Sequence, residues 1–479
     1  MCGILGLICN NNYNISNESF ININNSNFNR GPDDNGVYFY NYGNYQIKLG
    51  HTRLSILDLT TNANQPMHSY TGRYTICFNG EIYNHLFLRK IIDKMVNIQW
   101  KTNCDTETLL NMFEIFSPED VIEKLEGMFS FILFDKKDNS ILVARDLAGE
   151  KPLYFSINEK FLFFSSDLKT LIKIPDFEKK INNKALQYFL EKNYIPNPIS
   201  IYDGVFKLPP ASFLKIDLEK FKWNKIKNFE DINSTSGLNF KKWWKIDLKY
   251  NDNKNKYDFF EQKKYIHSLL RESVKQQLIS DVPLGAFLSG GIDSSLIVSL
   301  MTEFSSQVNT FAIGYEDNEY DESKYAEKVA NKLETNHQSY IFSKLEIVNF
   351  VKNSSNIYSE PFADSSQIPT LLVSKIAKQK VKVVLTGDGG DELFGGYNQF
   401  NSWDSSRFIW MDALPVEEVS ITSPLYLNSA SHSVCISTTN ISTSVISEML
   451  ETIIIGAIVS NLIESQSFAV RPDLSERPA

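Results

Sequence analysis

Short apolar runs recur through the first 200 residues, and polar, turn-forming residues separate them. The runs are rich in β-branched and aromatic residues, a pattern typical of short strands in stacked sheets. We expect strands over residues 74–78, 128–134, 141–144 and 161–165. Apolar residues at helical spacing favour helices over 105–116 and 184–192. This mixture predicts an α+β sandwich.

The pattern changes after about residue 259, where helical stretches alternate with short buried runs. We expect helices over 262–279, 294–304 and 322–332, and strands over 284–288, 308–313 and 381–386. Such a rhythm is the βαβ signature of a parallel sheet covered on both faces. The second fold prediction is therefore an α/β doubly wound parallel sheet.

These patterns divide the chain into four ranges. Residues 2–200 form the sandwich domain, and 201–258, a loop-rich range with Pro209, Pro210 and the Asn- and Lys-rich stretch 251–256, form a connector with an insertion. Residues 259–400 form the parallel-sheet domain. The last range, 401–479, is a divergent tail, because no lysine follows Lys382 and Ser and Thr dominate 419–446.

Composition limits the partners. Hydrophobic residues make up 42% and charged residues 22% of the 479 positions, as in soluble globular proteins. A net charge of -9 with no basic stripe argues against nucleic acid. The apolar run at 452–463 is too short to span a bilayer, so no membrane partner is expected. Five cysteines without metal-ligand spacing indicate free thiols in a reducing, cytoplasmic compartment.

The first candidate for chemistry is Cys2, which directly follows Met1. Removal of Met1 leaves a cysteine with both a thiol and a free α-amine. The amine titrates near 8 and accepts a proton near neutral pH, so it serves as the base that activates the thiol. Cys2 is therefore a candidate nucleophile, although a cysteine at this position also arises by chance.

The second candidate is a glycine- and serine-rich turn between an expected strand and helix. Its glycines let the backbone approach phosphate closely, and the helix N-terminus that follows presents free N–H groups to an anion. The serine hydroxyls add donors, and its aspartate suits Mg²⁺ between phosphate oxygens. It is not a Walker A loop, because it has no lysine. The motif reads Leu288-Ser289-Gly290-Gly291-Ile292-Asp293-Ser294-Ser295.

The third candidate follows the expected strand at 381–386, where ligands of doubly wound sheets gather. Three carboxylates among three glycines suit Mg²⁺ and pyrophosphate better than a packed core, although a plain acidic turn has the same composition. The motif reads Thr386-Gly387-Asp388-Gly389-Gly390-Asp391-Glu392.

A fourth set of residues lies in the sandwich domain. Asn79 and the adjacent Gly80 backbone N–H could form an oxyanion hole for thiolate attack on an amide. Arg53 could pair bidentately with a carboxylate, while Glu81 and Asp105 could receive an ammonium group. Each alone is more often a surface or turn residue, but together they would recognise an amino acid with an amide side chain.

These motifs resemble those of the glutamine-hydrolysing asparagine synthetase family over residues 2–400. The first domain is similar to its N-terminal-nucleophile glutaminase, an αββα sandwich, and the second to its ATP-pyrophosphatase synthetase domain. The first match rests on Cys2-Gly3-Ile4, Arg30-Gly31-Pro32-Asp33, the segment from Arg53 to Asp58, and the segment from Phe78 to Asn84. The second rests on the two glycine-rich motifs and on Ser359-Glu360-Pro361-Phe362-Ala363-Asp364.

The resemblance implies a role for each matched residue. Cys2 would attack the glutamine amide, Asn79 and Gly80 would stabilise the oxyanion, and the backbone near Leu57 would join Arg53, Glu81 and Asp105 in holding the substrate. Leu288 and Ile313 would border the adenine of ATP, and Thr386 and Gly387 would touch the nucleotide. Asp388 would assist acyl-adenylate formation, and Asp293 and Asp391 would handle Mg²⁺-pyrophosphate. Ammonia would then pass internally to a β-aspartyl-adenylate, giving asparagine, AMP and pyrophosphate. A homodimer is one option for the assembly.

Departures from the family pattern keep other functions open. Asn29 replaces the usual histidine, Leu147-Ala148 replaces Arg-Phe or Arg-Tyr, and the usual C-terminal segments are not found after about residue 400. The alternatives are amidation of another carboxylic acid such as a sugar acid, a glutaminase with a defective synthetase half, and a non-catalytic sensor of ATP or glutamine.

Overall fold

The computed structural model describes residues 1–10, 13–245, 258–316, 321–354 and 357–396. Within these residues the chain divides into two compact units, the first made of Met1–Lys245 and Ser354–Asp364 and the second of the remainder. The tail expected at 401–479 and the Asn-rich insertion at 251–256 lie outside the described residues.

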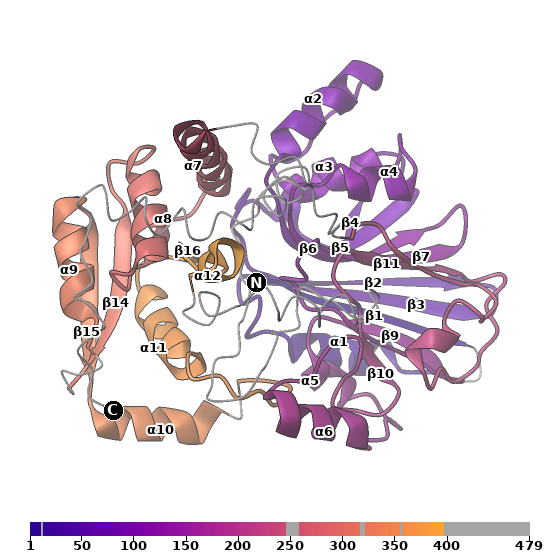
Figure 1. Cartoon of the computed structure of the whole chain (residues 1–479). Coiled ribbons are helices and arrows are strands. Elements are labelled where there is room, and N and C mark those ends of the chain that lie inside the picture. Colours follow the sequence, from indigo (N-terminus) through magenta and orange to yellow (C-terminus); the bar gives the residue numbers. More distant parts are fainter. Residues whose placement is uncertain (11–12, 246–257, 317–320, 355–356, 397–479) are drawn as a thin grey trace. The chain divides into compact units, whose positions relative to one another are not determined.

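The first unit contains two six-stranded antiparallel sheets (Figure 1). One sheet has the order β10-β8-β9-β1-β3-β2 and the other the order β12-β11-β7-β6-β5-β4. The strands of the first sheet are β1 (Gly3–Asn10), β2 (Asp34–Tyr42), β3 (Tyr45–Arg53), β8 (Tyr154–Ile157), β9 (Phe161–Ser165) and β10 (Val205–Lys207). Those of the second are β4 (Met67–His68), β5 (Tyr74–Ile82), β6 (Gly127–Asp135), β7 (Ser140–Arg145), β11 (Ser212–Asp217) and β12 (Leu238–Lys242).

Successive side chains of each strand point to opposite faces of its sheet, so the sandwich has three apolar layers: one between the sheets and one on the outer face of each sheet. On β1, Ile4 and Ile8 pack between the sheets against Ile132 and Phe134 of β6. Leu5 and Leu7, which alternate with them on β1, point to the opposite face and pack with the helices. Helices α1 (Asn17–Asn25), α5 (Leu168–Leu171) and α6 (Asn183–Lys192) cover that face. Helices α2 (His85–Met95), α3 (Asp105–Met112) and α4 (Pro118–Glu123) cover the outer face of the other sheet. The predicted αββα sandwich is confirmed.

The range 201–258 differs from the expected connector. Its described part contributes β10 to one sheet, and β11 and β12 to the other. Its prolines suggested a loop, yet they lie outside these strands, and alternate residues of β11 such as Phe213 and Leu214 enter the two different cores. Two 3₁₀ turns, η1 (Thr61–Ala63) and η2 (Phe229–Asp231), also belong to this unit.

The second unit is built on a parallel sheet of order β15-β14-β13-β16. Its strands are β13 (Leu284–Phe287), β14 (Asn309–Tyr315), β15 (Asn336–Phe342) and β16 (Val383–Leu385). Its helices are α7 (Phe259–Gln277), α8 (Ile292–Thr302), α9 (Ser323–Lys332), α10 (Lys344–Ser354), α11 (Gln367–Ala377) and α12 (Gly390–Phe394). Ala286 and Ala312 pack with α7, α8 and α9, whereas Phe311 packs with α11. Helices therefore lie on both faces, and the predicted doubly wound sheet is confirmed.

This strand order has functional meaning. β13 lies between β14 and β16, so the chain leaves β13 to one side and later returns to its other side. Ligands of open α/β sheets bind at the carboxyl ends of strands where the order reverses in this way. The loops after β13 and β16 are therefore neighbours at the expected position for a ligand. None of the helices in the described ranges is long and apolar enough to cross a membrane.

Candidate active site

Cys2 lies immediately before β1, the strand that pairs with both β3 and β9. Because Gly3 pairs with Thr52, the thiol sits beside the end of β3, where the Leu54 N–H donates to Cys2 Sγ at 3.4 Å. The Arg30 Nε–H donates to the Cys2 carbonyl at 3.2 Å. The Cys2 thiol in turn donates to the Leu54 carbonyl at 3.8 Å, so both backbone groups of Leu54 hold the sulfur in place.

The α-amine in this structure belongs to Met1, so the Cys2 nitrogen is an amide. Burial lowers the pKa of the Met1 amine to about 5, and the positive charges of Lys151 and Arg30 act in the same direction. An amine in this environment is neutral at pH 7 and therefore able to accept a proton.

Asn79 is fully buried in β5, and neither polar atom of its side chain has a hydrogen-bond partner among the described residues. Buried amides are normally hydrogen-bonded, so an unpaired one is suited to receive a ligand. The next residue, Gly80, has no room for a side chain: a Cβ there would collide with the Met128 carbonyl and lie 2.7 Å from Phe129 Cα. In the expected oxyanion hole, the Asn79 side-chain amide therefore has no hydrogen-bond partner among the described residues, and the adjacent Gly80 backbone is tightly packed.

Two side chains fix the peptide just before Asn79. The Phe78 N–H donates to Gln65 Oε1 at 2.6 Å, and His51 Nε2 lies 3.1 Å from the Phe78 carbonyl. Burial lowers the pKa of His51 to about 4, so its ring is neutral, and the carbonyl partner requires the proton on Nε2. His51 belongs to β3, in the sheet opposite β5, so it ties the two sheets together beside the expected oxyanion hole. Sequence reasoning missed this histidine because its partner comes from another sheet.

Glu81 and Asp105 are both buried and interact electrostatically. Burial, together with the charge of Asp105, raises the pKa of Glu81 to about 8, and Lys151 partly opposes this. Burial raises the pKa of Asp105 to about 6, although the Ile82 N–H donates to its Oδ2 at 2.8 Å. Two buried carboxyl groups with raised pKa values gain stability when a cation arrives. This pair is therefore suited to bind an ammonium group.

Lys151 and Arg30 connect this pair to the nucleophile. The buried Lys151 ammonium interacts electrostatically with Glu81 and Arg30, and Arg30 interacts with Cys2. The structure thus gathers the predicted nucleophile and the predicted ammonium-binding pair around two cations. The role of Lys151 carried no signal in the sequence.

Arg53 is positioned differently from the expectation. Its terminal N–H groups already donate to the Thr60 carbonyl at 2.8 Å, Asn64 Oδ1 at 2.7 Å, the Leu57 carbonyl at 3.4 Å and the Asp58 carbonyl. The guanidinium therefore organises the loop after β3, including the backbone near Leu57. A bidentate clamp on a carboxylate would require some of these bonds to be exchanged.

In the second unit, the loop after β13 folds back on itself at the start of α8. The Ser289 and Ser294 hydroxyls lie 3.0 Å apart, the Gly291 N–H donates to Ser289 Oγ, and Ser295 Oγ donates to the Gly291 carbonyl at 2.6 Å. Gly290 has φ +81°, and a Cβ there would lie 2.6 Å from the Tyr325 backbone of α9. Glycine is required there, and the loop presents the N-terminus of an 11-residue helix.

The loop after β16 packs directly on this one. A Cβ on Gly387 would lie 2.7 Å from the Ser294 nitrogen, and one on Gly390 would lie 2.7 Å from the Asp293 carboxyl carbon. Thr386 Oγ1 donates to Asp388 Oδ2 at 3.0 Å. The structure therefore brings together the two predicted motifs, with Asp293 against Gly387 and Gly390, the second of which directly precedes Asp391.

The two residues expected to border adenine lie near the ends of the paired strands β13 and β14, where the Leu288 N–H donates to the Phe311 carbonyl at 2.9 Å, but they pack on different faces of the sheet. Leu288 is buried among the residues on the α8 side of the sheet, whereas Ile313 packs with the α11 side. No three Asp, Glu, His or Cys side chains in the described ranges converge as a metal site. Mg²⁺ in phosphate-transfer sites takes one or two carboxylates plus substrate phosphates, so the donors of Asp293 and Asp391 fit it.

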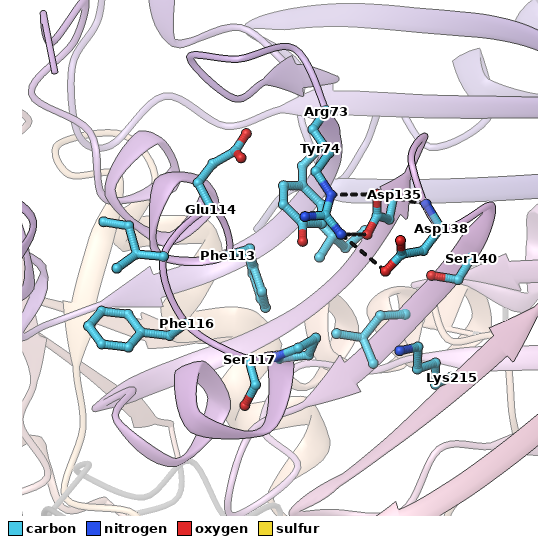
Figure 2. Close-up of a pocket in the computed structure, with 14 residues that line it drawn as sticks. Arg73, Tyr74, Phe113, Glu114, Phe116, Ser117, Asp135, Asp138, Ser140 and Lys215 are labelled. Atoms are coloured by element: carbon cyan, nitrogen blue, oxygen red, sulfur yellow. Dashed lines mark hydrogen bonds and ion pairs between the residues drawn. The ribbon is translucent and has the colours of Figure 1, made fainter. Parts of the chain in front are cut away.

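A separate pocket of about 280 Å³ lies in the first unit (Figure 2). Arg73 crosses it and forms ion pairs with Asp135 at 2.6 Å and Asp138 at 3.1 Å, while Phe113 and Phe116 form an apolar wall. Arg73 already pairs with Asp135 and Asp138, and none of the predicted site residues lines the pocket. It is not the candidate active site.

Two family models match the chain, one after the other. A glutamine amidotransferase domain matches residues 1–228, and an asparagine synthase domain matches residues 265–451. The second match continues into the range expected to diverge. A solved structure, glutamine phosphoribosylpyrophosphate amidotransferase from Bacillus subtilis, has 14% identity and a TM-score of 0.34 over 71% of this chain and 65% of its own, too low to support an argument.

Two curated relatives are similar over most of this chain. A Methanocaldococcus jannaschii protein provisionally named glutamine-hydrolyzing asparagine synthetase 2 is 38% identical over 83% of this chain and 76% of its own length. Glutamine-hydrolyzing asparagine synthetase 1 of Bacillus subtilis is 34% identical over 77% of this chain, which spans about half, 54%, of that relative. With both domains matched in order and this identity to the first relative, the chain belongs to the glutamine-hydrolyzing asparagine synthetase family.

Proposed function

We propose that this chain hydrolyses glutamine at Cys2 and transfers the ammonia to a carboxylate activated by ATP, with aspartate as the acceptor and asparagine, AMP and pyrophosphate as products. The observation that carries the glutaminase half is the buried, unpaired Asn79 amide in the same unit as the Glu81–Asp105 pair and the Cys2 thiol. The names of the curated relatives support aspartate as the acceptor.

In the first half-reaction, the α-amine of Cys2, freed by removal of Met1, takes the thiol proton. The thiolate attacks the amide carbon of glutamine, and the developing oxyanion accepts hydrogen bonds from the Asn79 side chain and the Gly80 N–H. The protonated amine gives its proton to the departing nitrogen, so ammonia leaves and a thioester remains. Water then hydrolyses the thioester to glutamate.

Substrate orientation follows from the charges. The α-ammonium of glutamine would bind between Glu81 and Asp105, which become fully ionised when the cation arrives. The α-carboxylate would bind near Arg53 and the Leu57 backbone. Lys151, which interacts with Glu81, keeps the site from accumulating uncompensated negative charge.

In the second half-reaction, the acceptor carboxylate attacks the α-phosphorus of ATP, and pyrophosphate leaves. The N–H and hydroxyl groups from Ser289 to Ser295 would hold the phosphates at the N-terminus of α8. Mg²⁺, held by Asp293 and Asp391, would neutralise the pyrophosphate, and Asp388 would assist formation of the acyl-adenylate. Ammonia then attacks the acyl carbon and AMP leaves.

The test begins with the wild-type chain and ammonium in place of glutamine. Aspartate-dependent pyrophosphate release shows that the synthetase half works and that aspartate is the acceptor. No release, with glutamate still formed from glutamine, points to another acceptor such as a sugar acid or to a defective synthetase half. We expect Cys2→Ala to lose glutamine-dependent synthesis and to retain ammonia-dependent synthesis. Continued use of glutamine by this variant would refute the assignment of the nucleophile.

A further inference from the structure

Two loops of the first unit meet at Asp58. One is the loop between β3 and β4, which carries Leu57 and closes on the Arg53 guanidinium. The other is the stretch between α2 and α3, and it leads directly into Asp105 at the start of α3. The groups proposed to receive the α-carboxylate and the α-ammonium of glutamine therefore depend on two separate loops.

The side chain of Asp58 joins these loops. Its Oδ2 accepts the Asn103 N–H at 2.8 Å, and Asn103 lies two residues before Asp105. Its Oδ1 accepts the Thr60 N–H at 3.0 Å and the Thr60 hydroxyl at 2.6 Å. The Asp58 carbonyl accepts an N–H of Arg53. One buried residue thus binds the Arg53 loop on one side and the approach to α3 on the other.

Asp58 is suited to this place by charge and by backbone. Burial opposes its ionisation, but hydrogen bonds from Thr60 and Asn103, with the charge of Arg53, hold its pKa below the ordinary value. Its carboxylate is therefore ionised at neutral pH and accepts every one of these bonds. Its φ of +53° lies in the left-handed region, which aspartate tolerates better than most residues.

The approach to α3 is rigid, so it transmits the position of Asn103 to the helix. Arg89 donates to the Thr102 carbonyl at 2.9 Å and to the Cys104 carbonyl at 3.0 Å, on either side of Asn103. Its Nε–H donates to the Thr108 hydroxyl of α3 at 3.0 Å. A shift of Asn103 therefore moves the first turn of α3 with it.

The loop after β3 has other attachments that should preserve its fold without the Asp58 carboxylate. The Ser55 N–H donates to Asp33 Oδ2 at 2.8 Å, and Gln65 Nε2 donates to Thr106 Oγ1 at 3.5 Å. Loss of the carboxylate should therefore loosen the spacing between the two loops without unfolding either of them.

We propose that Asp58 is a positioning residue for amino-acid recognition, which fixes the spacing between the loop that receives the α-carboxylate and the helix start where Asp105 receives the α-ammonium. The assignment rests on the proposed function, which places glutamine in this site. Both charged groups of glutamine sit on one carbon atom, so they bind together only when their partners lie at one spacing. A ligand with only one of the two groups can shift toward its single partner.

The test compares ligands that carry both groups with ligands that carry one, using the full chain after removal of Met1. The readouts are KM and kcat for glutamine, and the inhibition constants of glutamate, 4-carbamoylbutanoate and 4-aminobutanamide. Glutamate carries both groups, whereas the last two compounds lack the α-amine and the α-carboxylate of glutamine.

Two variants remove the carboxylate without backbone strain. Asp58→Gly removes all its bonds, and glycine adopts a positive φ readily. Asp58→Asn keeps the shape and one acceptor oxygen. The matched control is Asp176→Gly, because Asp176 also has a positive φ, +63°, and only an exposed ion pair with Lys160 at 3.4 Å is printed for its carboxylate in the same unit.

We expect KM for glutamine and the inhibition constant of glutamate to rise on the order of tenfold in Asp58→Gly, the effect of a small displacement in a binding site. Asp58→Asn should give a smaller rise and Asp176→Gly none. The constants of the two single-group compounds and kcat should change much less. An unchanged KM overturns the proposal, and so does an equal rise for all four ligands, because Asp58 would then be merely structural. If the wild-type chain forms no glutamate from glutamine, the proposed function fails before any variant is compared.

Discussion

Replacing Glu81 by glutamine should make the unliganded protein more stable and its glutaminase weaker. Burial and the charge of Asp105 raise the pKa of Glu81 from 4.5 to about 8, and only 6% of the residue is exposed. Ionised Glu81 is therefore unfavourable in the folded protein until an ammonium group arrives. Glutamine at this position has nearly the same shape and carries no charge.

The magnitude follows from linkage between protonation and folding. Between pH 4.5 and about 8 the folded protein holds a proton that the unfolded chain has released, so stability falls as pH rises through this interval. Each pH unit corresponds to about 1.4 kcal/mol, which gives about 3 kcal/mol at pH 7 and about 5 kcal/mol above pH 8. The Glu81→Gln variant carries no titrating group at this position and so lacks this pH-dependent loss of stability. Its advantage over wild type should be near zero at pH 4.5 and grow toward pH 8.

Thermal unfolding of both proteins without glutamine, from pH 5 to pH 9, measures this difference. A matched control is Glu107→Gln, because the equally buried Glu107 carboxylate accepts bonds from the Lys101 and Thr102 N–H groups and from the Thr102 hydroxyl. That variant should be less stable than wild type, because the side-chain nitrogen of glutamine cannot accept the hydrogen bonds that the carboxylate accepts. Parallel pH profiles for wild type and Glu81→Gln would refute the reasoning.

The same variant should bind glutamine less well. Loss of a charged partner for the α-ammonium removes about 1.5–3 kcal/mol, so KM for glutamine should rise about 10- to 100-fold. Ammonia-dependent synthesis should be unchanged. An unchanged KM would remove Glu81 from the ammonium site.

Three further changes test other parts of the two units. His51→Leu should lower kcat of the glutaminase about tenfold or more with little change in KM, because an oxyanion donor acts in the transition state. His51→Gln should recover part of this loss. Equal effects on kcat and KM would contradict a role of His51 through the Phe78 carbonyl. Gly80→Ala should destabilise the fold by about 1–3 kcal/mol and lower glutamine hydrolysis, because a methyl group there overlaps the Met128 carbonyl. If this variant melted at the same temperature as wild type, the close packing around Gly80 would be wrong. Asp293→Asn should abolish pyrophosphate release and spare glutamine hydrolysis, and an unaffected pyrophosphate rate would remove Asp293 from the metal site.

Contiguous motifs could be predicted well from the sequence. The loops after β13 and β16 are each a single run of glycines, serines and carboxylates between a strand and a helix, so local pattern was enough to identify them. Their mutual contact, with Gly390 against Asp293, depends on the strand order, which only the structure shows.

Groups that depend on the packing of distant strands could not be predicted. Arg53 has the right residue type for a carboxylate clamp, but only the folded loop shows that the Thr60 and Leu57 carbonyls already occupy its N–H groups. The partner of His51, the Phe78 carbonyl, belongs to the opposite sheet. The charged groups that interact with Lys151, such as Glu81 and Arg30, come near it only in the folded protein. In the range 201–258, the prolines at 209 and 210 concealed three short strands, of which β10 and β11 pair with strands from outside the range, β8 and β7.

The position of Cys2 before the central strand β1 has a consequence for any sample of this protein. The proposed base, the free α-amine of Cys2, does not exist until Met1 is cleaved, whereas the phosphate-binding loops need no such maturation. A preparation in which cleavage is incomplete is then a mixture of two enzymes, one able to use glutamine and one confined to free ammonia. The intact mass of the N-terminal peptide would give the proportion of each, and that proportion sets the ceiling on the glutamine-dependent specific activity.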